Sequence, residues 1–126
     1  MGYAHIENLY KNTDILLFKE VYALEKIHGT SAHISICDGR LHHFAGGVAH
    51  ADFTALFDSA LLTDTFARMG IIAATIYGEA YGGKCQGMSR VYGPSFLFVT
   101  FEVRLADSWL SVPQAEMVAI ELGLAF

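Results

Sequence analysis

The stretch SAHISICDGRLHHF, residues 31–44, decides the fold because it carries the pattern of a β-hairpin. Apolar and polar residues alternate from Ser31 to Cys37, which is typical of a strand with one buried face. Asp38–Gly39 is a pair that favours a tight turn between antiparallel strands, and Arg40–Phe44 follows as the second strand. The sequence therefore predicts antiparallel sheet at this point of the chain.

Upstream and downstream of this hairpin, the pattern predicts further strands and helices. The segment ILLFKEVYAL, residues 15–24, is apolar and rich in residues that favour extended structure, so we expect a strand ending near Lys26. Apolar residues at helical spacing predict a helix over 52–70, or two helices divided at Thr63–Asp64. Further predicted strands cover Ile71–Tyr77 and Phe96–Val103.

The C-terminal part carries the best-marked helix. Ser111 and Gln114 have the spacing of a capping box, Pro113 stands in the first turn, and Gly123 ends the segment. The order of elements predicts an α+β domain in which antiparallel β-sheets are flanked by helices. The apolar residues at 124–126 resemble the start of another element, so we expect a domain that is incomplete at its C-terminus.

Composition narrows the classes of protein. Of the 126 residues, 53% are hydrophobic and 17% are charged, so we expect exposed apolar surface that another copy, another chain or a further segment covers. No apolar stretch reaches the roughly 18 residues of a membrane span and no secretory signal is present, which predicts a cytoplasmic protein, or one of the host cytoplasm if its source is viral. Cys37 and Cys85 lack the spacing of a zinc site or a disulfide framework. The net charge of −5 excludes nucleic-acid binding through overall charge.

The first candidate for chemistry is Lys26, in the segment EKIHGT at residues 25–30. A lysine at the end of a buried strand and before a glycine turn is held in one place, as a nucleophile must be. The structural alternative is a lysine that pairs with Glu25 or caps a strand at the surface.

The second candidate is the carboxylate of Glu79, in the segment YGEAYGGK at residues 77–84. A carboxylate that leaves an apolar strand into a glycine-rich turn can bind a ribose hydroxyl or a metal, and glycines let backbone N–H groups approach a ligand. The alternative is an ordinary turn, because the spacing matches neither a P-loop nor a dinucleotide-binding motif.

The third candidate is an aromatic ring in the strand FLFVTFEV, residues 96–103. A ring that lines a pocket can stack on a purine, and the alternative is a ring in the hydrophobic core. His42, His43 and His50 have no carboxylate or thiol partner at a known ligand spacing, so we expect them on exposed loops rather than at a metal.

Taken in order, KIHGT, then YGEAYGG about fifty residues later, then a Phe-rich strand ending at acidic Glu102 resemble the covalent nucleotidyltransferase superfamily of ligases and capping enzymes. The chain is most similar to the RNA ligase 2-type family of ATP-dependent RNA ligases, in which His replaces the Asp of the superfamily's Lys-x-Asp-Gly motif, as His28 does here. The resemblance runs from about Glu7 to the end. It implies an ATP-grasp-like nucleotidyltransferase fold, with residues 1–126 as the N-terminal portion of the adenylyltransferase domain.

The resemblance also implies roles for individual residues. Lys26 attacks the α-phosphate of ATP and carries AMP as a covalent adduct. The AMP then passes to the 5′-phosphate end of an RNA, which is joined to a 3′-hydroxyl end, either between two strands or at a nick in a duplex. The nucleotide-binding residues are Glu25, Lys26, His28, Gly29, Glu79, and Phe98, with Phe98 stacked on adenine. Glu79 and Glu102 are the candidate ligands for Mg²⁺ or Mn²⁺.

Two departures from the family pattern leave a second hypothesis open. The family's arginine after the first hairpin has no clear counterpart, since Arg40 comes slightly early. The family's Glu-Gly-hydrophobic-hydrophobic and Lys-x-Lys strands are absent. The alternative to an active ligase is therefore a shortened, catalytically inactive relative that binds nucleotide or associates with itself through exposed apolar surface.

Overall fold

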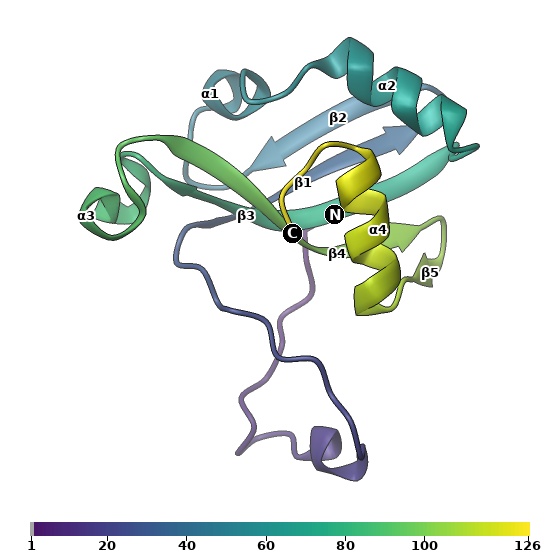
Figure 1. Ribbon diagram of the computed structural model, residues 1–126. Helices are drawn as coiled ribbons and strands as arrows, with labels where there is room; N and C mark the ends of the chain where they lie inside the picture. Colours follow the sequence, from purple (N-terminus) through teal and green to yellow (C-terminus); the bar gives the residue numbers. More distant parts are fainter. Residues whose placement is uncertain (1) are drawn as a thin grey trace.

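The computed structural model describes residues 2–126, which form an α+β fold around one five-stranded antiparallel sheet. The strand order is β2-β1-β3-β4-β5, and the helices flank the sheet (Figure 1). The predicted fold class is thereby confirmed at this level. The elements are η1 (Asp14–Leu17), β1 (Thr30–Cys37), β2 (Arg40–Ala45), α1 (His50–Thr54), α2 (Ser59–Arg68), β3 (Ala73–Gly82), η2 (Cys85–Gly87), α3 (Ser89–Tyr92), β4 (Phe96–Leu105), β5 (Ser108–Trp109) and α4 (Val112–Glu121).

The predicted hairpin is present, with Cys37 opposite Arg40 at its closed end. Asp38 and Gly39 both have positive φ, 48° and 75°, as a two-residue turn matched to the strand twist requires. The predicted strand at Ile71–Tyr77 is β3, which begins slightly later and runs on to Gly82, and the predicted strand at 96–103 is β4. Long central strands β1, β3 and β4 therefore form the rigid platform of the fold.

One face of the sheet carries the hydrophobic core. Figure 1 shows α1 and α2 over this face. Burial of apolar side chains between sheet and helices is the main stabilising force, at roughly 25 cal/mol per Å² of area removed from water. The core includes Ala32, Ile34 and Ile36 of β1, Phe53 of α1, Leu62 and Phe66 of α2, Ala74, Ile76 and Ala80 of β3, Phe98 and Val103 of β4, and Ala115, Val118 and Leu122 of α4.

The opposite face is here called the open face, because α1 and α2 cover only the core face (Figure 1). Side chains on one strand alternate between faces, and directly opposed residues of neighbouring strands share a face. On each strand, every second residue belongs to the open face, and these residues lie directly opposite one another on neighbouring strands. They are Ser31, His33 and Ser35 of β1, Thr75, Tyr77 and Glu79 of β3, and Val99 and Glu102 of β4.

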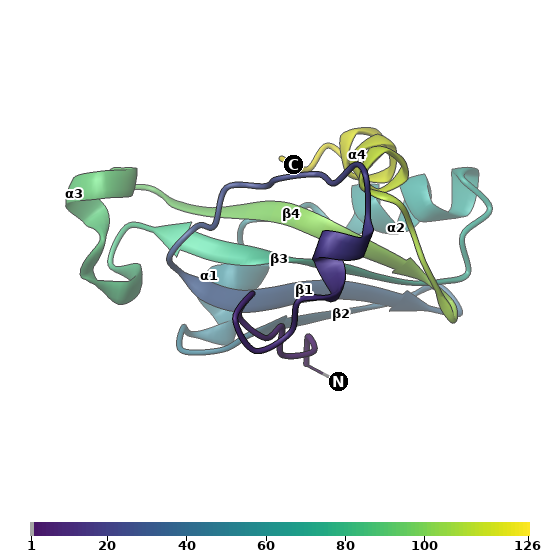
Figure 2. The same cartoon turned by 90° about the horizontal axis from the view of Figure 1, so that it is seen from below.

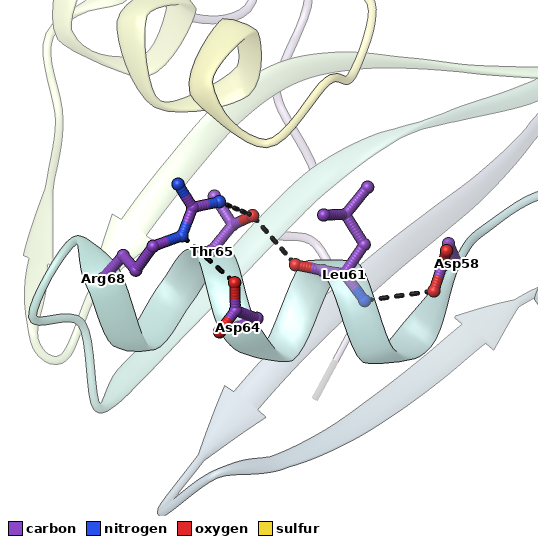
Figure 3. Close-up of polar contacts among 5 residues, drawn as sticks. All are labelled: Asp58, Leu61, Asp64, Thr65 and Arg68. Carbon is purple, nitrogen blue, oxygen red and sulfur yellow. Dashed lines mark hydrogen bonds and ion pairs between the residues drawn. The ribbon is translucent and has the colours of Figure 1, made fainter.

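The predicted 52–70 helix is two helices, but the predicted division at Thr63–Asp64 is wrong. The break comes earlier because Asp58 caps α2, its side chain accepting a hydrogen bond from the N–H of Leu61 at 3.0 Å. Thr63–Asp64 lie inside α2, where the Asp64 carboxylate meets Arg68 one turn later at 3.1 Å (Figure 3). The capping interaction thus sets where the second helix starts.

The predicted C-terminal helix is confirmed as α4, including its capping box. The side chain of Ser111 accepts from the N–H of Gln114, and the Gln114 side chain accepts from the N–H of Ser111 at 3.0 Å. After Gly123, which has φ of 71°, the chain returns along β4, and the carbonyl of Ala125 accepts the N–H of Thr100 at 2.8 Å. None of the helices in residues 2–126 is long and apolar enough to cross a membrane.

The predicted strand at residues 15–24 is wrong. Residues 14–17 form the 3-10 helix η1, and residues 18–28 belong to neither a helix nor a strand. A strand requires a neighbour to pair its backbone, and no strand within residues 2–126 pairs with this segment. Residues 4–28, here called the N-terminal arm, extend away from the sheet on its open-face side (Figures 1 and 2).

Candidate functional site

The segment around Lys26 is tied to Glu79 by a hydrogen bond. The N–H of Gly29 donates to Oε1 of Glu79 at 3.1 Å across fifty residues of sequence. Glu79 itself is held in the middle of β3, opposite Ser31 of β1 and Val99 of β4. Two of the three sequence motifs therefore meet at the end of the sheet where β1 begins.

Burial raises the pKa of Glu79, because removing a carboxylate from water disfavours its charged form. Three groups act in the opposite direction and lower the pKa of Glu79: the N–H of Gly29 and the side chains of His28 and Lys26. Both side chains thus act on Glu79 through space, and within residues 2–126 neither forms an ion pair with it.

Gly29 is the one residue that lets the chain pass so close to β3. A Cβ atom at this position would lie 2.1 Å from the carbonyl oxygen of Ala80 and 2.9 Å from Cβ of Tyr81. No side chain fits there without moving the backbone. The glycine of the EKIHGT segment therefore serves close approach rather than a positive-φ turn.

His28 is fixed through its backbone. Its N–H donates to the hydroxyl of Tyr92, at the end of α3, at 3.0 Å. The two consecutive N–H groups of His28 and Gly29 are thus both bonded, which holds the chain immediately after Lys26 in place.

The side chains of Glu25 and Lys26 are exposed. Within residues 2–126 the ion pairs join Arg68 to Asp64 and Arg104 to Asp107, so the alternative of a Lys26–Glu25 pair is not supported. Arg40, the doubtful counterpart of the family arginine, lies at the hairpin end of β2, roughly 20 Å along β1 from the end where Lys26 lies.

Phe98 lies on the core face, away from Glu79. The ring is 8% exposed and packs edge-on against Phe53 and Phe57 of the helical layer, with centroid distances of 5.4 and 5.6 Å. Its neighbour Val99 is the residue opposite Glu79, so Phe98 and Glu79 point to opposite faces. Phe98 is therefore part of the hydrophobic core in this structure, and a purine held beside Glu79 would not meet this ring.

Phe101, three residues later, is the ring that faces the open side. The register between β3 and β4 shifts at Tyr77/Gly78, so that Glu102 pairs with Tyr77 and Thr100 with Gly78, leaving Phe101 unpaired. A bulge of this kind re-aims side chains, and Phe101 contacts the ring of Tyr3 at 5.1 Å. The bulge thus brings Phe101 and Glu102 to the face that carries Glu79.

Tyr3 fills the centre of an aromatic cluster on this face, formed with Phe101, Tyr77 of β3 and Trp109 of β5. Its ring lies 5.3 Å from that of Tyr77 and 6.2 Å from that of Trp109, and its hydroxyl donates to Glu102. Burial and the contact with Glu102 raise the pKa of the Tyr3 hydroxyl. The cluster lies on the same face of the sheet as Glu79, because Tyr77 stands two residues before Glu79 on β3.

The residues do not form a metal site by themselves. Within residues 2–126, no group of three or more His, Cys, Asp or Glu side chains is gathered closely enough to hold an ion. Glu79 already accepts from Gly29, and Glu102 accepts from Tyr3. The predicted metal roles of Glu79 and Glu102 thus find no complete donor set here.

The histidines differ from the expected exposed loops. His42 and His43 lie on β2, and His43 faces the core side, stacked on Phe57 at 5.6 Å, with Nε2 buried and unpartnered. A cavity of about 530 Å³ is lined by residues of the 47–56 and 83–96 segments, and neither Lys26 nor Glu79 is among them.

Sequence reasoning missed Tyr3, Tyr92 and Phe101. Tyr92 bonds to His28, which lies sixty-four residues earlier in the sequence, so no local pattern links the two. Phe101 reaches the open face through a bulge, and a single sequence carries no signal for a bulge. Phe101 had one available signal, its position directly before the acidic Glu102. Neither the protein-family models nor the curated proteins contain a match to this chain.

Proposed function

We propose that this chain is the nucleotide-binding portion of an ATP-dependent polynucleotide ligase, most similar to an RNA ligase, in which Lys26 takes up AMP. The observation that carries the proposal is the meeting of Lys26, His28, Gly29 and Glu79 at one end of the open face. These residues come from two motifs fifty positions apart, and a structural role for the segment would not require a half-buried carboxylate that Lys26 and His28 both act on.

The proposed reaction is nucleophilic displacement at phosphorus. The Nζ lone pair of Lys26 forms a bond to the α-phosphorus of ATP, the bond to the bridging oxygen breaks, and pyrophosphate leaves with that electron pair while the amine loses a proton to solvent. The short connection through His28 and Gly29 limits the positions that Lys26 can take, which lowers the entropic cost of reaction. The AMP then passes to a 5′-phosphate end, where a 3′-hydroxyl end displaces it.

The base and ribose of ATP have separate candidate contacts. Glu79 keeps one carboxylate oxygen free of Gly29 and is suited to accept from a ribose hydroxyl. Phe101 replaces Phe98 as the candidate ring for the purine, because it shares the open face with Glu79. Mg²⁺ or Mn²⁺ enters this proposal only as the counter-ion of the ATP phosphates.

The test is covalent adenylation. The chain is incubated with ATP and Mg²⁺, and intact-protein mass spectrometry measures whether one AMP moiety is added. We expect the adduct in the wild type and in Lys11→Ala, a lysine of the arm remote from Glu79, and its loss in Lys26→Ala. An adduct that persists in Lys26→Ala, or no adduct in the wild type under any metal condition, contradicts the proposal.

A second function, a nucleotide-binding but inactive module, is favoured by one observation. Within residues 2–126, Lys26 and His28 are the basic side chains that act on the pKa of Glu79, which leaves few basic groups for a triphosphate. This function predicts ATP binding, measured by calorimetry, that Phe101→Ala weakens, together with no covalent adduct. The two functions are thus separated by the same protein sample.

A further inference from the structure

Lys26 lies in a segment whose backbone is held at one end. Within residues 2–126, no backbone–backbone hydrogen bond involves residues 19–28, and the bonded group of this segment is the N–H of His28, which donates to the Tyr92 hydroxyl at 3.0 Å. Ile27 is half-buried, but it is not among the residues packed against the hydrophobic core. A segment with so few contacts opens easily unless individual bonds restrict it. The bond to Tyr92 is therefore the first fixed point of the backbone after Lys26.

Tyr92 is itself mounted on a well-held support. Its N–H donates to the carbonyl of Met88 at 3.0 Å, and its ring packs edge-on against Tyr81 of β3, with centroids 5.4 Å apart. The loop that carries Tyr92 is closed at its base, where the N–H of Gly83 donates to the carbonyl of Gly93 at 3.1 Å. Both views place α3 at the end of the sheet where the N-terminal arm joins β1 (Figures 1 and 2). The hydroxyl is thus presented to the arm from a fixed side.

The position of His28 carries over to Lys26, because the two residues are close along the chain. Consecutive Cα atoms are about 3.8 Å apart, so the Cα atoms of Lys26 and His28 are at most about 7.6 Å apart. The second bond, from Gly29 to Glu79, lies one residue further from Lys26. A displacement of reacting atoms by about 1 Å can lower a rate on the order of 100-fold. The Tyr92 hydroxyl is therefore well placed to set where the Lys26 amine lies.

We propose that Tyr92 is a positioning residue for Lys26, whose hydroxyl fixes the N–H of His28 and thereby holds the amine on the side of Glu79. This role rests on the proposed function, because Lys26 is a nucleophile only if the chain forms the AMP adduct. In this role Tyr92 acts through the backbone and does not contact ATP. Its loss therefore lowers the rate of adenylation and leaves the binding of ATP unchanged.

The test compares two variants that each lose one hydroxyl. Tyr92→Phe keeps the ring that packs against Tyr81 and removes the acceptor of the His28 N–H. Tyr81→Phe is the matched control, because it alters the partner ring on β3 and leaves the bond to His28 in place. Intact-protein mass spectrometry follows adduct formation over time at a series of ATP concentrations, with Mg²⁺ present.

For Tyr92→Phe, we expect the rate at saturating ATP to fall about 30-fold, because the amine is displaced from the reacting phosphorus. The ATP concentration that gives half this rate should stay within about twofold of the wild type, since a role in positioning removes no contact with ATP. Tyr81→Phe should match the wild type in both quantities. Circular dichroism checks that both variants are folded.

Amide hydrogen exchange, measured by NMR, tests the bond without any reaction. The N–H of His28 should exchange about tenfold faster in Tyr92→Phe, because it has lost its acceptor, and should be unaffected in Tyr81→Phe. An adenylation rate that is unchanged in Tyr92→Phe overturns the positioning role, whatever the exchange of His28, and leaves the proposed function standing. A loss that comes from weaker ATP binding overturns the role as well. A wild type that forms no adduct overturns the proposed function and the positioning role together.

Discussion

Replacement of Gly29 by alanine should break the contact that joins the Lys26 segment to β3. The new Cβ atom would lie 2.1 Å from the carbonyl oxygen of Ala80, which is far inside van der Waals contact. The obstacle is backbone of a central strand, so the relief must come from movement of residues 28–30. That movement separates the N–H of Gly29 from Glu79 Oε1, now 3.1 Å away.

The magnitude follows from the groups involved. Loss of a hydrogen bond to a charged acceptor costs about 1.5–3 kcal/mol, and the displaced backbone adds about 1–3 kcal/mol of strain. Alanine offsets about 0.4–1 kcal/mol of this by restricting the unfolded chain. The net loss in the free energy of unfolding is about 3 kcal/mol, which for a chain of this length lowers Tm by about 12 °C.

Urea and thermal unfolding, followed by the fluorescence of the single residue Trp109, measure this loss. Gly2→Ala is the control, because a Cβ atom at Gly2 meets no atom within 4 Å. Adenylation by Gly29→Ala below its melting temperature should fall as well, since Lys26 loses its anchor. A Gly29→Ala protein that unfolds within about 0.5 kcal/mol of the wild type would refute the steric argument.

Three further variants test the surroundings of the site and the fold. Burial raises the pKa of Glu79, so the stability linked to this carboxyl is present below its ordinary pKa of 4.5 and is lost as pH rises through the raised pKa. The Glu79→Gln variant cannot ionise at this position, so its free energy of unfolding, measured by urea titration, should rise relative to that of the wild type between pH 4 and 8. Burial lowers the pKa of His43, so the stability linked to this imidazole is present above its ordinary pKa of 6.5 and is lost as pH falls. The His43→Phe variant should therefore make the unfolding midpoint less sensitive to acid between pH 7.5 and 5. The control is His5→Gln at an exposed position, which should leave this sensitivity unchanged. Ser111→Ala removes the helix cap of α4 and should lower the free energy of unfolding by about 1 kcal/mol, and unchanged stability would argue against the capping box.

Local patterns were sufficient for much of the fold. The hairpin at 31–44 and the capping box of α4 each depend on residues within a few positions of one another, so their physics is readable from the sequence. The strand expected at 15–24 failed for the opposite reason: an apolar, extended pattern states a preference, but a strand exists only where another strand is available to pair with it.

The candidate site likewise has one part that the sequence predicted and one part that it did not. EKIHGT and YGEAYGG mark Gly29 and Glu79 in the sequence, and their contact is present, although nothing local specifies it. Phe98 and Phe101 are indistinguishable as letters in a Phe-rich strand. A bulge at Tyr77/Gly78 decides which of the two rings reaches the open face, and it arises from the pairing of two distant strands.

By itself, then, the sequence determined where the first hairpin turns, how the last helix is capped and which residues carry nucleophilic or acidic groups, because these properties depend on neighbours along the chain. Tertiary structure alone decided that Phe98 is core, that Tyr92 holds His28 and that residues 19–25 are left without a partner. The physical reason is that face, burial and pairing are set by contacts between segments far apart along the chain, and these contacts exist only once the sheet has formed.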